Sequence, residues 1–207
     1  DGYDCITDFD ITVGLDIRPE VDIAVVDECV AEGTFEVLVT LTTPATSPYQ
    51  ISVNGGAFQN FVFNGSGEYT VTGLSSGLGQ TIAVRDITGC PDTDTFDIQP
   101  PLQFNAALTT LLDCETAPNN NAEITIDVTT GSGAYDYEID GPGAVDQART
   151  AMGGTSLTWS DASVAGSYTV TVYDTSTSVP NCLGSIIVDV PAAVTRLFNI
   201  TSFTNVT

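Results

Sequence analysis

Short runs of alternating apolar and polar residues recur along the whole chain. The clearest runs are Thr34–Thr42, Ala122–Val128 and Ser167–Tyr173. A period of two places the apolar side chains on one face, which is typical of a half-buried β-strand. No stretch has apolar residues at helical spacing for more than a turn or two. The pattern therefore predicts an all-β protein.

Glycine, asparagine, aspartate and proline separate these runs. Asn54-Gly55 predicts a hairpin with a type I′ turn, because both central residues of that turn need a positive φ. Asn64-Gly65 and Asp140-Gly141 give the same signal. Six or seven short strands with frequent turns in about 90 residues predict an immunoglobulin-like β-sandwich.

The chain also repeats itself. Tyr49–Gly55 matches Tyr135–Gly141, and Ile82–Asp86 matches Val170–Asp174. A period of about 85 to 92 residues indicates a tandem array. We expect immunoglobulin-like repeats at 18–100 and 101–191, the last strand or strands of a preceding repeat at 1–17, and the first strand of a following repeat at 192–207.

Five cysteines follow the repeat. Cys5 and Cys29 are 24 residues apart, as are Cys90 and Cys114. Two pairings respect the repeat: Cys29–Cys90 with Cys114–Cys182 inside each repeat, or Cys5–Cys29 with Cys90–Cys114 across each junction. We prefer the first, since it would join the opening and closing strands of one domain and stabilise it by roughly 4 kcal/mol. It leaves Cys5 to a partner upstream.

Regularly spaced cysteines, in a chain with no histidine and no CxxC motif, indicate an oxidising compartment and argue against a zinc site. By the same spacing, the repeat predicts a further cysteine immediately after Thr207. No segment reaches the roughly 18 to 20 apolar residues that a membrane helix needs. The N-terminus has no basic segment followed by an apolar one, so we expect any export signal to lie outside this sequence.

The charge is strongly negative. Four arginines, no lysine, no histidine and 27 acidic residues give a formal net charge of −23. Such a surface repels nucleic acid and anionic membranes, which excludes both as expected partners. The alternative interpretation of the carboxylates is weak Ca²⁺ binding. The candidate clusters are Asp8 with Asp10, then Asp92, Asp94 and Asp97, and then Asp136, Glu138 and Asp140.

No pattern predicts catalysis. Gly73–Gly77 matches the GxSxG motif of hydrolases, but that motif needs a histidine base and a following helix. The chain has no histidine, and no helix is predicted after the motif. Trp159 is predicted to lie in the core, with a sugar-stacking platform as its alternative role. Tyr49, Tyr135 and Tyr137 share one local motif and are predicted to pack. We therefore assign no catalytic, cofactor-binding or metal-binding residue.

Several segments together resemble the SprB-type repeat of Bacteroidota cell-surface proteins. In that family a Pro-Tyr-x-Tyr-Ser-Ile-x-Gly segment and a Gly-x-Tyr-Thr-Val-x-Val-x-Asp segment lead to Gly-Cys. The matching segments are Ser47–Phe58, Ile82–Cys90, Phe96–Pro100, Tyr135–Gly141 and Gly166–Asp174. The second repeat departs from the pattern by a longer interval between Asp174 and Cys182, and Asn181 replaces the glycine.

The resemblance implies a secreted adhesin, exported by the type IX secretion system, whose tandem repeats form a cell-surface stalk used in gliding or attachment. The expected partners are neighbouring repeats of the same polypeptide, and surface glycans or other cell-surface proteins. The alternative is a carbohydrate-binding accessory region of a secreted enzyme.

Proline directly follows the predicted last strand of each repeat, at Pro19, Pro100-Pro101 and Pro191. Proline restricts the backbone on both sides, so we expect stiff junctions.

Overall fold

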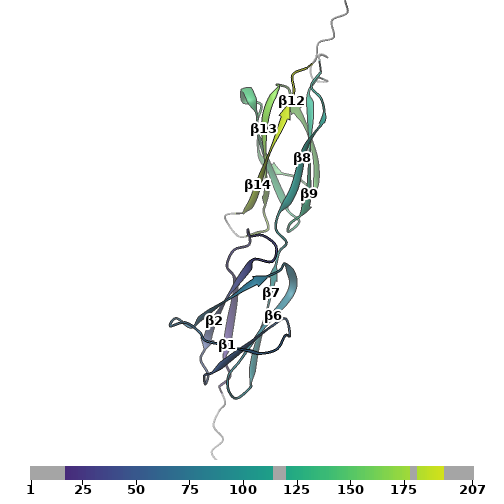
Figure 1. Cartoon of the computed structure of the whole chain (residues 1–207). Helices are drawn as coiled ribbons and strands as arrows, with labels where there is room; N and C mark the ends of the chain where they lie inside the picture. Colours follow the sequence, from purple (N-terminus) through teal and green to yellow (C-terminus); the bar gives the residue numbers. More distant parts are fainter. Residues whose placement is uncertain (1–16, 114–119, 178–180, 194–207) are drawn as a thin grey trace, which may run out of the picture. The chain divides into compact units, whose positions relative to one another are not determined.

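The computed structural model describes residues 17–113, 120–177 and 181–193 (Figure 1). The first seven strands are β1 (Glu20–Val25), β2 (Phe35–Thr43), β3 (Tyr49–Val53), β4 (Gln59–Phe61), β5 (Glu68–Leu74), β6 (Gly77–Arg85) and β7 (Pro91–Ile98). The next are β8 (Gln103–Thr110), β9 (Ala122–Thr130), β10 (Tyr135–Asp140), β11 (Gln147–Ala151), β12 (Ser156–Ala162), β13 (Gly166–Asp174) and β14 (Cys182–Val190). Within these residues, the short 3₁₀ helix η1 (Pro142–Ala144) is the only helix.

Both repeats form the same pair of antiparallel sheets. In the first repeat, a three-stranded sheet has the order β1-β2-β5 and a four-stranded sheet has the order β4-β3-β6-β7. In the second, the corresponding orders are β8-β9-β12 and β11-β10-β13-β14. Two facing sheets of three and four strands are an immunoglobulin-like sandwich. The prediction of tandem all-β sandwiches is confirmed.

The chain divides into two compact units, each made of segments that are separate in sequence. Of the described residues, unit 1 contains those up to Ala24, with Val37–Val71 and Gly79–Phe96. Unit 2 contains Val25–Glu36, Thr72–Leu78 and the described residues from Asp97 onward. The loop between β1 and β2 is therefore grouped with unit 2. The partial repeats expected at 1–17 and 192–207 lie almost entirely outside the described residues.

The alternating pattern builds the cores. Phe35, Val37 and Val39 on β2 are fully buried, and their neighbours along the strand are more exposed. On β9, Ile124 and Ile126 are fully buried in the same way. Period-two burial of this kind is the reason that these segments form strands facing a second sheet.

The turns agree only in part with the sequence. Asn54 and Gly55 both have positive φ, at 50° and 71°, so the type I′ turn is confirmed. The turn after Asn64 instead has its positive φ at Gly67. The type I′ prediction at Asp140-Gly141 is wrong, because Gly141 is extended and leads into η1. A Cβ atom on Gly141 would lie 2.4 Å from Cε1 of Tyr168, so close ring packing requires this glycine.

Candidate functional site

Equivalent aspartates anchor a loop in each repeat. Asp174, the last residue of β13, is fully buried. Its carboxylate accepts hydrogen bonds from the Ser132 backbone N–H, at 2.8 Å, from the Ser132 hydroxyl and from the Ser176 N–H. These bonds hold the loop between β9 and β10, which contains Ser132, and the loop after β13, which contains Ser176. The role of this carboxylate is therefore structural.

Asp86 has the corresponding position after β6. Its Oδ1 accepts hydrogen bonds from the Thr88 hydroxyl, at 2.5 Å, and from the Thr88 N–H, at 2.9 Å. The hydroxyl bond in particular stabilises the ionised carboxylate and lowers the pKa of Asp86 below its ordinary value of 3.8. The match between Ile82–Asp86 and Val170–Asp174 thus marks a shared loop anchor.

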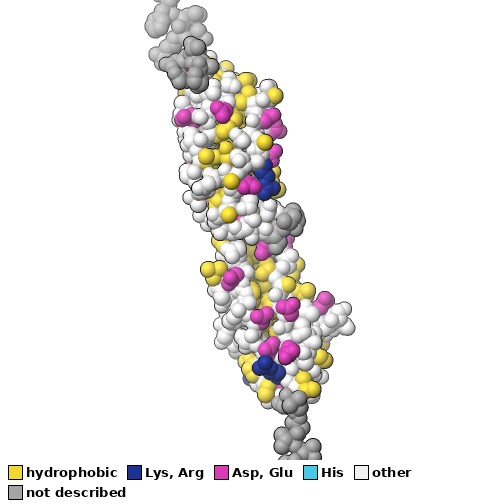
Figure 2. Space-filling model, turned by 180° about the vertical axis from the view of Figure 1, so that it is seen from behind, with side chains coloured by type: hydrophobic (Ala, Val, Ile, Leu, Met, Phe, Trp, Pro, Cys, Tyr) yellow, Lys and Arg dark blue, Asp and Glu magenta, His cyan; other side chains and the backbone are white. Residues whose placement is uncertain are grey.

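The other acidic residues do not gather into a site. Asp136 forms an ion pair with Arg149 at 2.8 Å, and Glu138 accepts a hydrogen bond from the Tyr173 hydroxyl at 2.7 Å. Figure 2 shows carboxylates scattered over the visible face, with few arginines among them. Nowhere in residues 17–113, 120–177 and 181–193 do three acidic or cysteine side chains form a group that could hold a metal ion. Weak Ca²⁺ binding stays a prediction.

Asp92 and Asp94 each accept a hydrogen bond from a backbone N–H. The Asp92 carboxylate accepts the Val21 N–H at 3.0 Å, and the Asp94 carboxylate accepts the Thr95 N–H at 2.8 Å. Asp97, one position before the end of β7, is exposed on the other face of the strand. Asp8 and Asp10 lie outside the described residues. The cluster at 92–97 is therefore divided between two faces of one strand.

The cysteine pairing differs from the sequence prediction. Cys29 forms a disulfide with Cys182, with a Cα–Cα distance of 5.1 Å and a sequence separation of 153. Both preferred in-repeat pairs, Cys29–Cys90 and Cys114–Cys182, are therefore wrong. The alternative pair Cys5–Cys29 is also excluded by this bond. Cys5 and Cys114 lie outside the described residues.

Strand direction explains why the in-repeat pair fails. The Val21 N–H donates to Asp92, so the start of β1 lies beside the start of β7, next to Cys90. Cys29 follows the far end of β1. Five residues of strand beyond Val21 cover about 16 Å, whereas disulfide-bonded Cα atoms lie within about 7 Å of each other. Cys29 and Cys90 therefore lie toward opposite ends of one sandwich.

Each end of the disulfide is held by its own loop. The exposed Cys29 donates its backbone N–H to Asp27 Oδ1 at 2.7 Å. Cys182 is 5% exposed, is paired with Asp174 across β13 and β14, and donates its N–H to Thr177 Oγ1 at 2.8 Å. Since Thr177 is buried too, the sulfur of Cys182 is presented from an ordered strand end.

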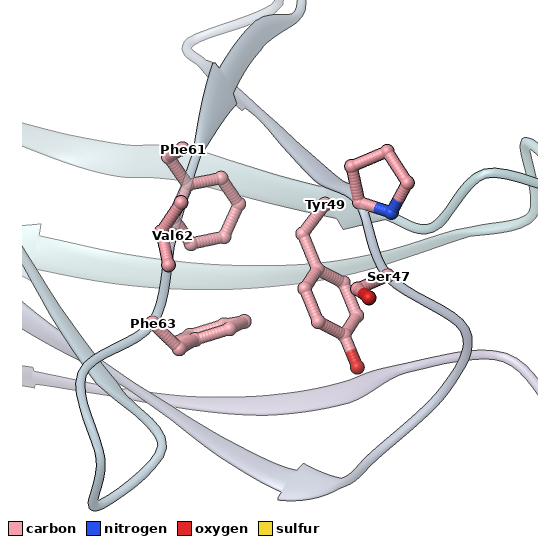
Figure 3. Close-up of a pocket in the computed structure, with 6 residues that line it drawn as sticks. Ser47, Tyr49, Phe61, Val62 and Phe63 are labelled. Atoms are coloured by element: carbon pink, nitrogen blue, oxygen red, sulfur yellow. The ribbon is translucent and has the colours of Figure 1, made fainter.

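An aromatic pocket opens beside the short strand β4. It has a volume of about 450 Å³ and is lined by Ser47, Pro48, Tyr49, Phe61, Val62 and Phe63. Figure 3 shows Ser47 and Tyr49 on one segment facing the other labelled residues on a second segment. The Phe61 and Phe63 ring centroids are 4.7 Å apart, and the Tyr49 and Phe63 centroids are 5.3 Å apart.

Sequence reasoning assigned Tyr49 to packing and missed the pocket. The Tyr49 hydroxyl donates to the Ala45 carbonyl at 2.7 Å, which fixes the ring as one wall. Val62, between two aromatic residues, is 84% exposed. The signal in the sequence was the run Phe61-Val62-Phe63, where a half-buried strand would have a polar residue at the exposed middle position.

The remaining aromatic predictions hold in unit 2. Trp159 is 5% exposed, and its ring centroid lies 5.7 Å from that of Tyr168, so its core position is confirmed. Tyr135 and Tyr137 are buried, which confirms that they pack. Burial raises the pKa of Tyr135, Tyr137 and Tyr168 above 10.0. The Tyr168 hydroxyl donates to the Val164 carbonyl at 2.7 Å, in the manner of a tyrosine corner.

The GxSxG match at Gly73–Gly77 runs from the end of β5 to the start of β6. A strand therefore follows the serine, where a nucleophile elbow has a helix. Across the ranges that the structure describes, no helix is long and apolar enough to cross a membrane.

Comparisons with known proteins identify no family for this chain. No family model matches the chain, and no curated protein matches it. Among solved structures, fibronectin(III)-like modules of Clostridium thermocellum CbhA match with 14% identity and a TM-score of 0.36, covering 87% of this chain and 100% of that one. A two-domain fibronectin type III segment of chicken tenascin matches with 14% identity and a TM-score of 0.38, covering 84% and 99%. The human OSCAR ligand-binding domain matches with 13% identity and a TM-score of 0.37, covering 83% and 97%.

Proposed function

We propose that this chain is a non-enzymatic structural segment of a large secreted bacterial surface adhesin or filament, built of tandem disulfide-linked β-sandwich repeats. The observation that carries the proposal is the Cys29–Cys182 bond, which joins the first sequence repeat to the second. A cross-link between consecutive repeats benefits a protein whose repeats act in series. The oxidising conditions that preserve such a bond support an extracellular location.

Two further observations support a structural role. Both repeats build the same sandwich and anchor equivalent loops with Asp86 and Asp174. The net charge of −23 makes neighbouring molecules repel each other, which keeps a crowded cell-surface protein from associating unspecifically. The resemblance to SprB-type repeats adds the proposal of type IX export and a role in gliding or attachment.

The disulfide also suggests a rule for the parent array. Cys90 immediately precedes β7, as Cys182 begins β14, and Cys29 corresponds to Cys114 in the sequence repeat. By this equivalence, the cysteine at the last strand of each repeat (the closing cysteine) bonds the cysteine after the first strand of the preceding repeat (the opening cysteine). Non-reducing peptide mapping of a fragment with one more N-terminal repeat should link Cys90 to that repeat's opening cysteine. A peptide that links Cys90 to Cys114 would contradict the rule.

Surface labelling of cells tests the proposal. Antibodies raised against this chain should label intact cells of the source organism, and a strain lacking type IX secretion should lose the label. Permeabilised cells of both strains provide the control for expression. Labelling that appears only after permeabilisation would overturn the adhesin proposal.

The aromatic pocket favours a second candidate, a carbohydrate-binding accessory region. Sugar rings stack on aromatic faces, and Phe63 is a partly exposed wall of the pocket. A glycan array with the chain and with Phe63→Ala distinguishes the candidates. Binding that is lost in Phe63→Ala would favour the carbohydrate-binding function, whereas the stalk proposal expects no glycan signal at this pocket.

A further inference from the structure

The Cys29–Cys182 disulfide closes a covalent ring around most of the chain. The ring spans 153 positions and contains every strand from β2 to β13. β1 lies on the N-terminal side of Cys29, and β14 runs from Cys182 to Val190 on the C-terminal side. A force that pulls the two ends of the chain apart must therefore pass from β1 to β14.

We propose that this disulfide is a tensile clamp, which carries load from Cys29 directly to Cys182 and shields residues 30–181 from extension. The inference rests on the proposed function, in which the chain is a stalk segment under tension. The sulfur bridge holds the two Cα atoms 5.1 Å apart. The alternative path through 153 peptide units could extend to about 500 Å, so it stays slack while the bridge is intact.

The segments that lead to the clamp are already extended. β14 pairs with β13 over nine positions, from Cys182 opposite Asp174 to Val190 opposite Gly166. A β-strand rises about 3.3 Å per residue, which is close to the limit of a stretched chain. β1 is also a strand, and the hydrogen bond from the Val26 N–H to the Glu36 carbonyl at 3.0 Å continues its pairing beyond Val25. Tension along β1 and β14 therefore produces little lengthening.

The clamp also has firm attachments. At one end, Cys182 is buried and its N–H bonds the buried Thr177 hydroxyl. At the other, the Thr34 N–H and hydroxyl both bond the Ala31 carbonyl, at 3.1 and 2.7 Å, which closes the loop that carries Cys29. The Ser76 N–H bonds Glu32 in the same loop at 2.8 Å. These bonds lie inside the ring and hold each cysteine in its position, while the load itself passes through β1, the disulfide and β14.

Single-molecule pulling tests the clamp on the full chain, with handles attached at Asp1 and Thr207. Held under constant force without reductant, the oxidised chain should not release the ring. Adding a small thiol should then produce steps that sum to about 500 Å, the extended length of 153 residues. Because the reductant acts on the native protein, this measurement does not depend on whether a cysteine variant folds.

Two variants complete the test. Cys29→Ser and Cys182→Ser should each release the same length without reductant, because either substitution removes one end of the bond. Release of about 500 Å by the oxidised parent chain, or no added length after reduction, would overturn the clamp. The stalk proposal fails in a different experiment: antibody labelling found only inside the cell would overturn it and would leave the pulling result unchanged.

Discussion

Replacing Asp174 by alanine should strongly destabilise unit 2. The carboxylate is fully buried and accepts three hydrogen bonds, two from Ser132 and one from the Ser176 N–H. A hydrogen bond to a charged group contributes about 1.5–3 kcal/mol, and here the acceptor is fully buried while its donors on Ser132 and Ser176 are part-buried or exposed. The bonds share one acceptor, so their contributions do not add. We expect a loss of about 3–4 kcal/mol, a large part of the roughly 5–13 kcal/mol typical of a 90-residue domain.

Trp159 provides the assay. It is the only tryptophan of the chain, and it is buried in unit 2. Urea unfolding followed by its fluorescence therefore reports the unit that contains Asp174. The expected result for Asp174→Ala is a lower midpoint with an unchanged slope, since the slope follows the surface exposed on unfolding.

Asp189→Ala is the matched control. Asp189 accepts the Ser167 hydroxyl at 2.6 Å, but both residues are exposed. Water replaces an exposed hydrogen bond, so we expect a change of no more than about 0.5 kcal/mol. A loss below about 1 kcal/mol in Asp174→Ala, or equal losses in both variants, would refute the burial argument.

Three further predictions concern titration and packing. Burial raises the pKa of Tyr168 and the two other buried tyrosines above 10.0, so their neutral phenols stabilise unit 2 fully below pH 10, and this stabilisation is lost at higher pH. Trp159 fluorescence should therefore show unit 2 unfolding in alkali. A unit 2 that keeps its structure after these phenols ionise would contradict the prediction. Because the pKa of Asp86 is lower in the folded state than its unfolded value of 3.8, the ionised carboxylate stabilises the fold above pH 3.8, and this stabilisation is lost as the pH falls through the folded pKa. Circular dichroism should therefore show a smaller acid-induced loss of stability in Asp86→Asn than in the parent chain. Gly141→Ala should cost about 2–3 kcal/mol by overpacking against the Tyr168 ring, whereas Gly154→Ala, with open space around it, should be tolerated in the same urea titration.

The strands and the sandwich could be predicted because they depend on local pattern. Alternation at Phe35, Val37 and Val39 determines which face is buried, and the matched segments indicate that the same fold occurs twice. Asn54-Gly55 determined its turn because the two residues need no distant contact to adopt positive φ. Asp140-Gly141 did not, since the ring of Tyr168 decides the conformation there.

The disulfide could not be predicted because its two cysteines are far apart in the sequence and come together only in the folded structure. The repeat restricts the pairs to a few registers, but which register forms depends on where the strand ends lie. Cys29 and Cys90 look adjacent in a scheme of opening and closing strands, yet the bond between Val21 and Asp92 places them toward opposite ends. Strand direction, which sequence spacing does not contain, decides the partner.

The carboxylates of β7 have a consequence for how tandem repeats fold. β7 is an edge strand, and neighbouring repeats with similar strands are prone to exchange them during folding. Asp92 and Asp94 lie on the same face of β7 as the buried Phe96 and Ile98. Inward-pointing charges on an edge strand oppose its pairing with a foreign strand, since the carboxylates would be buried without partners. Asp92 and Asp94 thus oppose the exchange of β7 in the first repeat, whereas the inward face of β14 in the second repeat has no acidic residue.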